Sequence, residues 1–103
     1  MSERSEGVFL GGHVAIVTGG GRGIGRATAR GLAAAGASVV VVARTIDEIE
    51  SVAGEIRREG GNATAVRADV TNVGAVQRMV AETDRIFGPP DLLVNGAGVA
   101  QPF

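Results

Sequence analysis

The chain has 103 residues, of which 45% are hydrophobic, and a formal net charge of −1. This length allows a single domain, and the near-neutral charge argues against nucleic acid or an anionic membrane surface as a partner. With no cysteine, one histidine and no apolar run long enough to span a membrane, the sequence predicts a cytoplasmic protein without disulfides, a signal peptide or a metal site.

The first predicted element is a strand over residues 14–17, a short continuous apolar run typical of a strand buried on both faces. The residues before it, 1–12, are expected to form an N-terminal arm, and residues 13–103 a single domain. A glycine-rich loop follows, and a helix should begin near Gly23 and end at Gly36. The predicted inward face of this helix is Ile24, Ala27, Thr28, Gly31, Leu32 and Ala35.

A second strand and helix follow. Residues 39–43 form a strongly β-branched run that predicts the strand, and Thr45 and Glu48 form a Thr-x-x-Glu capping box that opens the helix. Two glycines at positions 60 and 61 should end this helix. Its predicted buried face is Ile49, Val52, Ala53 and Ile56.

The remaining residues repeat the pattern once more and add a last strand. Residues 63–68 predict a third strand, residues 69–72 lead into a third helix, and a Gly-Pro-Pro sequence at 88–90 stops it. The inward face of that helix is predicted as Val76, Met79, Val80, Thr83 and Phe87. A fourth strand is expected over 92–94. This alternation predicts an α/β fold, a Rossmann-like parallel sheet with strand order 3-2-1-4, truncated after the fourth strand.

The glycine-rich loop between the first strand and helix reads Thr-Gly-Gly-Gly-Arg-Gly-Ile-Gly over residues 18–25. Gly19 would allow a tight turn, Gly23 would let a pyrophosphate approach the backbone, and Gly25 would let helix and strand pack closely. The amides around Ile24 and the helix dipole would face the phosphates. A generic glycine turn before a helix is the alternative, but the strand-loop-helix setting favours dinucleotide binding.

With this loop the chain resembles the short-chain dehydrogenase/reductase family, in the branch marked by Thr-Gly-x-x-x-Gly-x-Gly, and is similar to its 3-oxoacyl reductase-like members. Two further landmarks support the resemblance. Asp69 stands where the family has an Asp that hydrogen-bonds the adenine ring, although an Asp before a helix can also be a solvated cap. The sequence Asn-Gly-Ala-Gly at 95–98 stands where the family has Asn-Asn-Ala-Gly. In it Asn95 can contact the cofactor or only bridge strands behind it, and Gly96 replaces the second Asn.

Arg44 indicates which cofactor the site would take. A NAD site usually has an Asp or Glu at the end of the second strand to bind the ribose 2′-hydroxyl, but here the strand ends in Ala-Arg-Thr. An arginine fork suits a 2′-phosphate, and Arg22 resembles the basic residue that many NADP(H)-using relatives carry in the glycine loop. NADP(H) is therefore expected, with NAD(H) as second choice. A methyltransferase-type domain would also need an acid here, so Arg44 argues against it.

The residues on which hydride transfer depends in the family are not found in this sequence. The family uses a Ser and a Tyr-x-x-x-Lys pair beyond the Asn-Ala-Gly region, whereas all ten basic residues here are Arg and there is no Tyr. The resemblance thus implies an NADP(H)-dependent oxidoreductase as the full-length parent. That parent is expected to be a homo-oligomer and to act on a small-molecule carbonyl or alcohol. A non-catalytic nucleotide-binding module is the alternative. The predicted cofactor-binding residues are Gly19, Gly21, Arg22, Gly23, Ile24, Gly25, Arg44, Thr45, Asp69, Val70, Asn95, Gly96, Ala97 and Gly98.

Overall fold

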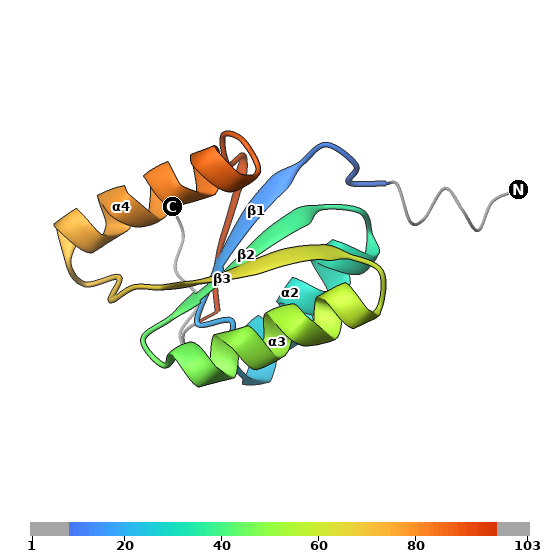
Figure 1. The fold of residues 1–103 in the computed structure, drawn as a ribbon, viewed down its shortest axis with the longest axis horizontal. Helices are drawn as coiled ribbons and strands as arrows, with labels where there is room; N and C mark the ends of the chain where they lie inside the picture. The colour runs from blue at the N-terminus through green and yellow to red at the C-terminus, as the bar shows by residue number, and fades with distance from the viewer. Residues whose placement is uncertain (1–8, 97–103) are drawn as a thin grey trace, which may run out of the picture.

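The computed structural model describes residues 9–96, which form a sheet of four parallel strands with three helices. The elements in chain order are β1 (Val14–Thr18), α2 (Gly23–Ala34), β2 (Ser38–Ala43), α3 (Ile46–Arg58), β3 (Asn62–Arg67), α4 (Val73–Ile86) and β4 (Leu92–Asn95). The strand order is β3-β2-β1-β4 (Figure 1), which confirms the predicted topology. No helix in the described ranges is long and apolar enough to cross a membrane.

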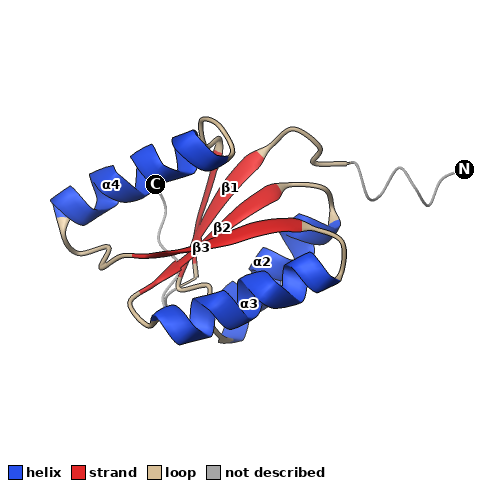
Figure 2. Ribbon diagram, viewed as in Figure 1, coloured by secondary structure: helices blue, strands red, loops and turns tan. Residues whose placement is uncertain are grey.

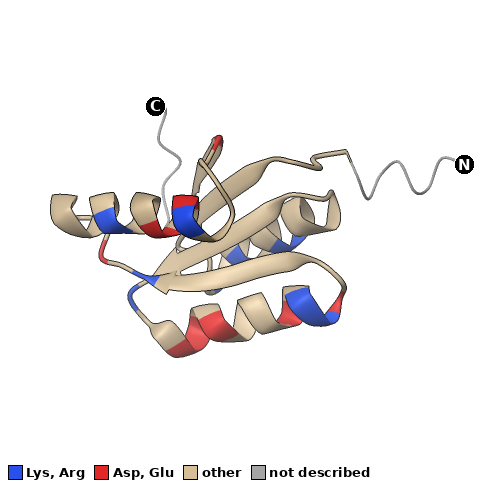
Figure 3. Cartoon of the chain, turned by 45° about the horizontal axis from the view of Figure 1, so that its top comes forward, with Lys and Arg blue, Asp and Glu red and all other residues tan. Residues whose placement is uncertain are grey.

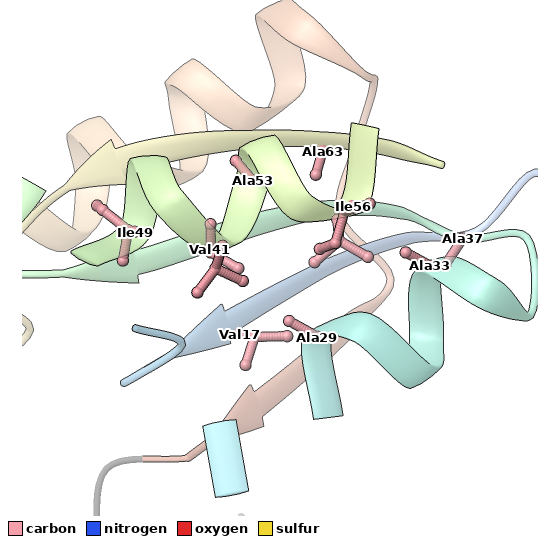
Figure 4. Close-up of a cluster of buried hydrophobic side chains, with 11 residues drawn as sticks. Val17, Ala29, Ala33, Ala37, Val41, Ile49, Ala53, Ile56 and Ala63 are labelled. Atoms are coloured by element: carbon pink, nitrogen blue, oxygen red, sulfur yellow. The ribbon is translucent and has the colours of Figure 1, made fainter. Parts of the chain in front are cut away.

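The helices lie in two layers, with α2 and α3 on one face of the sheet and α4 on the other (Figure 2). Alternate residues of β2 point to opposite faces. Val39 and Val41 pack with α2 and α3 in the larger apolar cluster (Figure 4), whereas Val40 and Val42 pack with Met79 of α4 in a second cluster. The continuous valine run thus reflects a strand buried on both faces.

The inward face of α2 differs from the prediction. The buried residues are Gly25, Ala29 and Ala33, while Ile24 is 76% exposed and Ala27 is exposed as well. The predicted face was therefore rotated by about one residue from the observed one, although Leu32 packs against the larger cluster as predicted. The reason is steric, because Gly25 must face the sheet where the helix begins against the end of β1.

The faces of α3 and α4 agree more closely with the pattern. All four residues predicted for α3 are buried. In α4, Met79 and Thr83 are buried as expected, but Val80 is 40% exposed, which corrects that assignment. The Thr83 hydroxyl donates to the Met79 carbonyl oxygen at 2.9 Å, so this polar side chain is buried without an unpaired donor.

Ion pairs hold α3 beside α2. Arg26 of α2 donates two hydrogen bonds to the carboxylate of Glu55 in α3, at 3.1 and 2.8 Å, and Arg30 donates to Glu59 at 2.6 Å. Figure 3 colours the arginines of α2 blue and the acidic and basic residues of α3 red and blue. The pairs join α2 to the C-terminal end of α3.

Candidate functional site

A cavity of about 630 Å³ opens at the carboxyl ends of the strands. This is the edge at which open parallel sheets bind ligands. The structure brings most of the predicted cofactor-binding residues together in its wall, namely Gly19, Gly21, Arg22, Gly23, Ile24, Arg44, Thr45, Asp69, Val70 and Gly96. Two others, Gly25 and Asn95, lie outside the lining. Ala97 and Gly98 fall outside the described residues.

The glycine loop has the backbone conformation that only glycine adopts without strain at two of its positions. Gly19 has φ +66° and Gly23 has φ +62°. The Gly19 amide donates to the Val42 carbonyl oxygen at 2.8 Å, which ties the loop to β2. The first turn of α2 follows directly, and a first helical turn leaves backbone N–H groups without intrahelical partners. These groups and the positive helix end are suited to hold a phosphate.

Gly25 supports the loop from beneath. A Cβ atom at this position would lie 2.0 Å from the carbonyl oxygen of Gly19 and 3.2 Å from the Cα of Gly20. No side chain fits in that space, so α2 can approach the end of β1 only with glycine here. Its role is close packing, as the sequence predicted, and it is not in the cavity wall.

Arg22 is the N-cap residue of α2, and its side chain is 85% exposed at the cavity rim. The guanidinium Nε lies 3.9 Å from Oε2 of Glu48 in α3. The capping box predicted for Thr45 and Glu48 is not formed, because the Thr45 side chain makes no cap hydrogen bond. The tertiary approach of the glycine loop instead places Glu48 against Gly21 and toward Arg22.

Arg44 follows the last residue of β2 and lies exposed in the cavity wall. Within residues 9–96, no carboxylate lies within ion-pair distance of its guanidinium. Thr45, the N-cap residue of α3, lies next to it. This end of β2 therefore presents a positive charge that is available to an anionic ligand.

Asp69 lies beyond the end of β3 and organises a turn. Its Oδ1 accepts from the Thr71 amide at 2.9 Å and from the Thr71 hydroxyl at 2.6 Å. These bonds hold the pKa of Asp69 below its ordinary value, with a smaller contribution from the positive charge of Arg44. The N-cap of α4 is Asn72, whose side chain accepts from the Ala75 amide. Asp69 is thus not the cap of α4.

Asn95 and Gly96 hold β4 beside the glycine loop. The Thr18 hydroxyl of β1 donates to Oδ1 of Asn95 at 3.2 Å, which places Asn95 as a bridge between the two strands. A Cβ on Gly96 would lie 2.7 Å from the Cα of Gly25 and 3.0 Å from the Thr18 carbonyl oxygen. Gly96 therefore also permits a close backbone approach at the floor of the cavity.

Five cavity residues were not predicted as site residues, namely Val42, Ala43, Glu48, Ala68 and Thr71. Four of them could have been predicted from their position in the chain, because they stand at or just past the carboxyl ends of β2 and β3. Glu48 had no such signal, because its spacing from Thr45 indicated a cap. In the described part of the chain, no cluster of three or more His, Asp or Glu residues could hold a metal ion.

The family model described as short chain dehydrogenase matches residues 13–103. The chain therefore belongs to the short-chain dehydrogenase/reductase family, as its glycine loop and following motifs indicated.

Known relatives agree with this assignment. The chain is 44% identical over 90 residues to a 3-oxoacyl-(acyl-carrier-protein) reductase of Synechocystis sp., covering 86% of this chain and 36% of the relative. It resembles a hydroxysteroid dehydrogenase from Escherichia coli with a TM-score of 0.84 and 40% identity, over 96% of this chain and 43% of that one. A metagenomic short-chain oxidoreductase in complex with NADP matches with a TM-score of 0.80 and 40% identity, over 86% of this chain and 40% of that one. The chain spans about a third of the length of the curated relatives it matches.

Proposed function

We propose that the chain forms the cofactor-binding part of an NADP(H)-dependent oxidoreductase that transfers hydride between the nicotinamide and a small alcohol or ketone. The observation that carries this proposal is the cavity at the strand ends, which has the glycine loop and α2 N-terminus on one side and Arg44 and Asp69 on the other. A nicotinamide cofactor supplies the hydride chemistry, and the protein supplies binding and orientation.

The lining residues fit the separate groups of such a cofactor. The pyrophosphate would meet the backbone amides of the loop and of the first turn of α2 around Ile24. Arg44 and Arg22 would receive a 2′-phosphate, since charge-assisted hydrogen bonds from arginine contribute about 1.5–3 kcal/mol each. Asp69 would accept from the adenine ring, and Val70 would pack beside it.

NADP(H) is favoured over NAD(H) because no carboxylate stands at the end of β2 to receive a ribose 2′-hydroxyl. Arg44 occupies that place, and the described residues offer it no ion-pair partner. One of the solved structures similar to this chain, at 40% identity, is a complex with NADP. Together these observations support a 2′-phosphate as the group that Arg44 binds.

A non-catalytic nucleotide-binding module is the second candidate, favoured by composition. These 103 residues have no Tyr and no Lys, and a general acid or base contributes about 10²–10⁴-fold to the rate of proton-coupled steps. We therefore expect the isolated chain to bind NADPH without oxidising it. Titration by NADPH fluorescence, followed by an assay with a panel of ketones and aldehydes, tests both points. No binding would contradict the proposed site. Sustained turnover would contradict the expectation that this chain binds NADPH without oxidising it.

A further inference from the structure

Glu48 places a carboxylate in the wall of a cavity that otherwise suits an anion. Its Oε2 lies 3.9 Å from the Nε of Arg22, and both residues line the cavity together with Arg44. The Glu48 side chain is 37% exposed, against 85% for Arg22, so the carboxylate is the more buried partner of this pair.

Gly21 determines where this carboxylate lies. A Cβ at position 21 would meet the Cβ of Glu48 at 2.9 Å and its Oε1 at 3.0 Å. The side chain of Glu48 therefore lies flat against the glycine loop, and the absence of a side chain at Gly21 is what permits the contact. The same placement takes Glu48 away from the capping role that its spacing from Thr45 indicated.

The two arginines of the cavity thus differ in their surroundings. Arg22 lies within ion-pair distance of Glu48, whereas no carboxylate of residues 9–96 lies within that distance of Arg44, whose charge acts only more weakly on Asp69. A 2′-phosphate that binds Arg22 must displace Glu48 from the guanidinium or share the guanidinium with it. The phosphate also meets the negative charge of Glu48 at close range. A ribose 2′-hydroxyl meets neither cost.

We propose that Glu48 is a specificity-determining residue that lowers the preference of this site for a 2′-phosphate by holding Arg22 and repelling the phosphate. The inference rests on the proposed function, because it concerns how the same cavity distinguishes NADP(H) from NAD(H). Arg44 supplies the preference for the phosphate and Glu48 limits it. The affinity ratio of the two cofactors therefore depends on both residues.

The test is Glu48→Gln, which keeps the size of the side chain and removes its charge. We expect NADP(H) to bind about four- to 25-fold more tightly, because an exposed ion pair and a nearby like charge each account for about twofold to fivefold in affinity. NAD(H) affinity should change by less than about twofold, since no 2′-phosphate is present. Dissociation constants from calorimetry at low ionic strength give both values.

Two further variants identify the cause. Asp47→Asn removes the same charge from the first turn of α3 at a residue outside the cavity lining, so the cofactor ratio should stay unchanged. In an Arg22→Gln background the effect of Glu48→Gln on NADP(H) should shrink to about twofold to fivefold, because the ion pair no longer exists and only the like charge of Glu48 remains. If the Glu48→Gln variant does not fold, Glu48→Ala takes its place and should change the affinity ratio in the same direction.

The outcomes separate the two proposals. If the unsubstituted chain binds neither cofactor, the proposed function fails. If it binds but Glu48→Gln leaves the ratio unchanged, or tightens both cofactors equally, the inference about Glu48 is overturned while the dinucleotide site stands. Circular dichroism of each variant shows that the fold is retained.

Discussion

Gly25 and Gly19 lie so close that a Cβ on Gly25 would be 2.0 Å from the Gly19 carbonyl oxygen. The first turn of α2 therefore rests directly on the turn that ends β1. This contact sets the rotation of the helix and holds the backbone of the loop at the cavity.

Gly25→Ala should consequently destabilise the chain and impair the loop. Overpacking of this kind costs about 1–3 kcal/mol, or more when the obstructing atom is backbone, and we expect cofactor affinity to fall at least about tenfold. Gly31→Ala is the matched control, because Gly31 is in the same helix with nothing within 4 Å of its added Cβ. That variant should be stabilised by about 0.5–1 kcal/mol. Urea unfolding measures both, and an equal effect of the two substitutions would contradict the packing argument.

The carboxylate of Asp69 should titrate below its ordinary pKa of 3.8 because it accepts two hydrogen bonds from Thr71. Because the pKa of Asp69 is lowered in the folded state, its ionised carboxylate stabilises the folded chain at pH values above the ordinary pKa. This stabilisation is lost as the pH falls through the lower folded-state pKa. Thr71→Val removes the hydroxyl donor and should raise the pKa of Asp69 toward 3.8.

Titration of the Asp69 side-chain carbon by NMR gives this pKa directly. Thr64→Val, on β3, serves as the control and should leave the pKa of Asp69 unchanged. A pKa of 3.8 or higher in the unsubstituted chain would show that the turn does not form in solution.

β4 lies at the edge of the described sheet, paired with β1 on one side, and its Leu93 is 49% exposed. An exposed apolar edge strand is a site of self-association. Leu93→Glu should therefore raise the monomer fraction at a given concentration, as measured by light scattering. Val80→Glu exposes the same charge on α4 at a side chain 40% exposed and should have a smaller effect. If the two substitutions raised the monomer fraction equally, the association would not depend specifically on the β4 edge.

Much of the fold could be predicted from local pattern. The apolar runs marked the four strands, and the alternation with helices predicted their order, because right-handed crossovers leave few topologies. The rotation of α2 could not be predicted from its pattern. Small apolar residues occur around much of that helix, so Ala27 and Ala29 are equally suited to the core until the Gly25 contact is known. Ile24 was misplaced for the same reason.

The site was predictable where a residue acts through backbone conformation or chain position. Gly19 has the positive φ of the tight turn that the loop spacing predicted, and Arg44 and Asp69 stand past strand ends that meet at one edge. Glu48 was not predictable, because its spacing from Thr45 satisfies a local rule. Only the tertiary approach of Gly21 decides that the side chain turns toward Arg22 instead.

The most direct test of the proposed function is the ratio of NADP(H) to NAD(H) affinity before and after Arg44→Asp. The aspartate removes the guanidinium, repels a 2′-phosphate and can accept from a 2′-hydroxyl, whereas Arg78→Asp makes the same charge change on α4, outside the cavity lining. Calorimetric titration should show that the unsubstituted chain prefers NADP(H), that Arg44→Asp abolishes or reverses this preference, and that Arg78→Asp retains it. An unchanged ratio in Arg44→Asp would contradict the account, because Arg44 would then be only a surface charge.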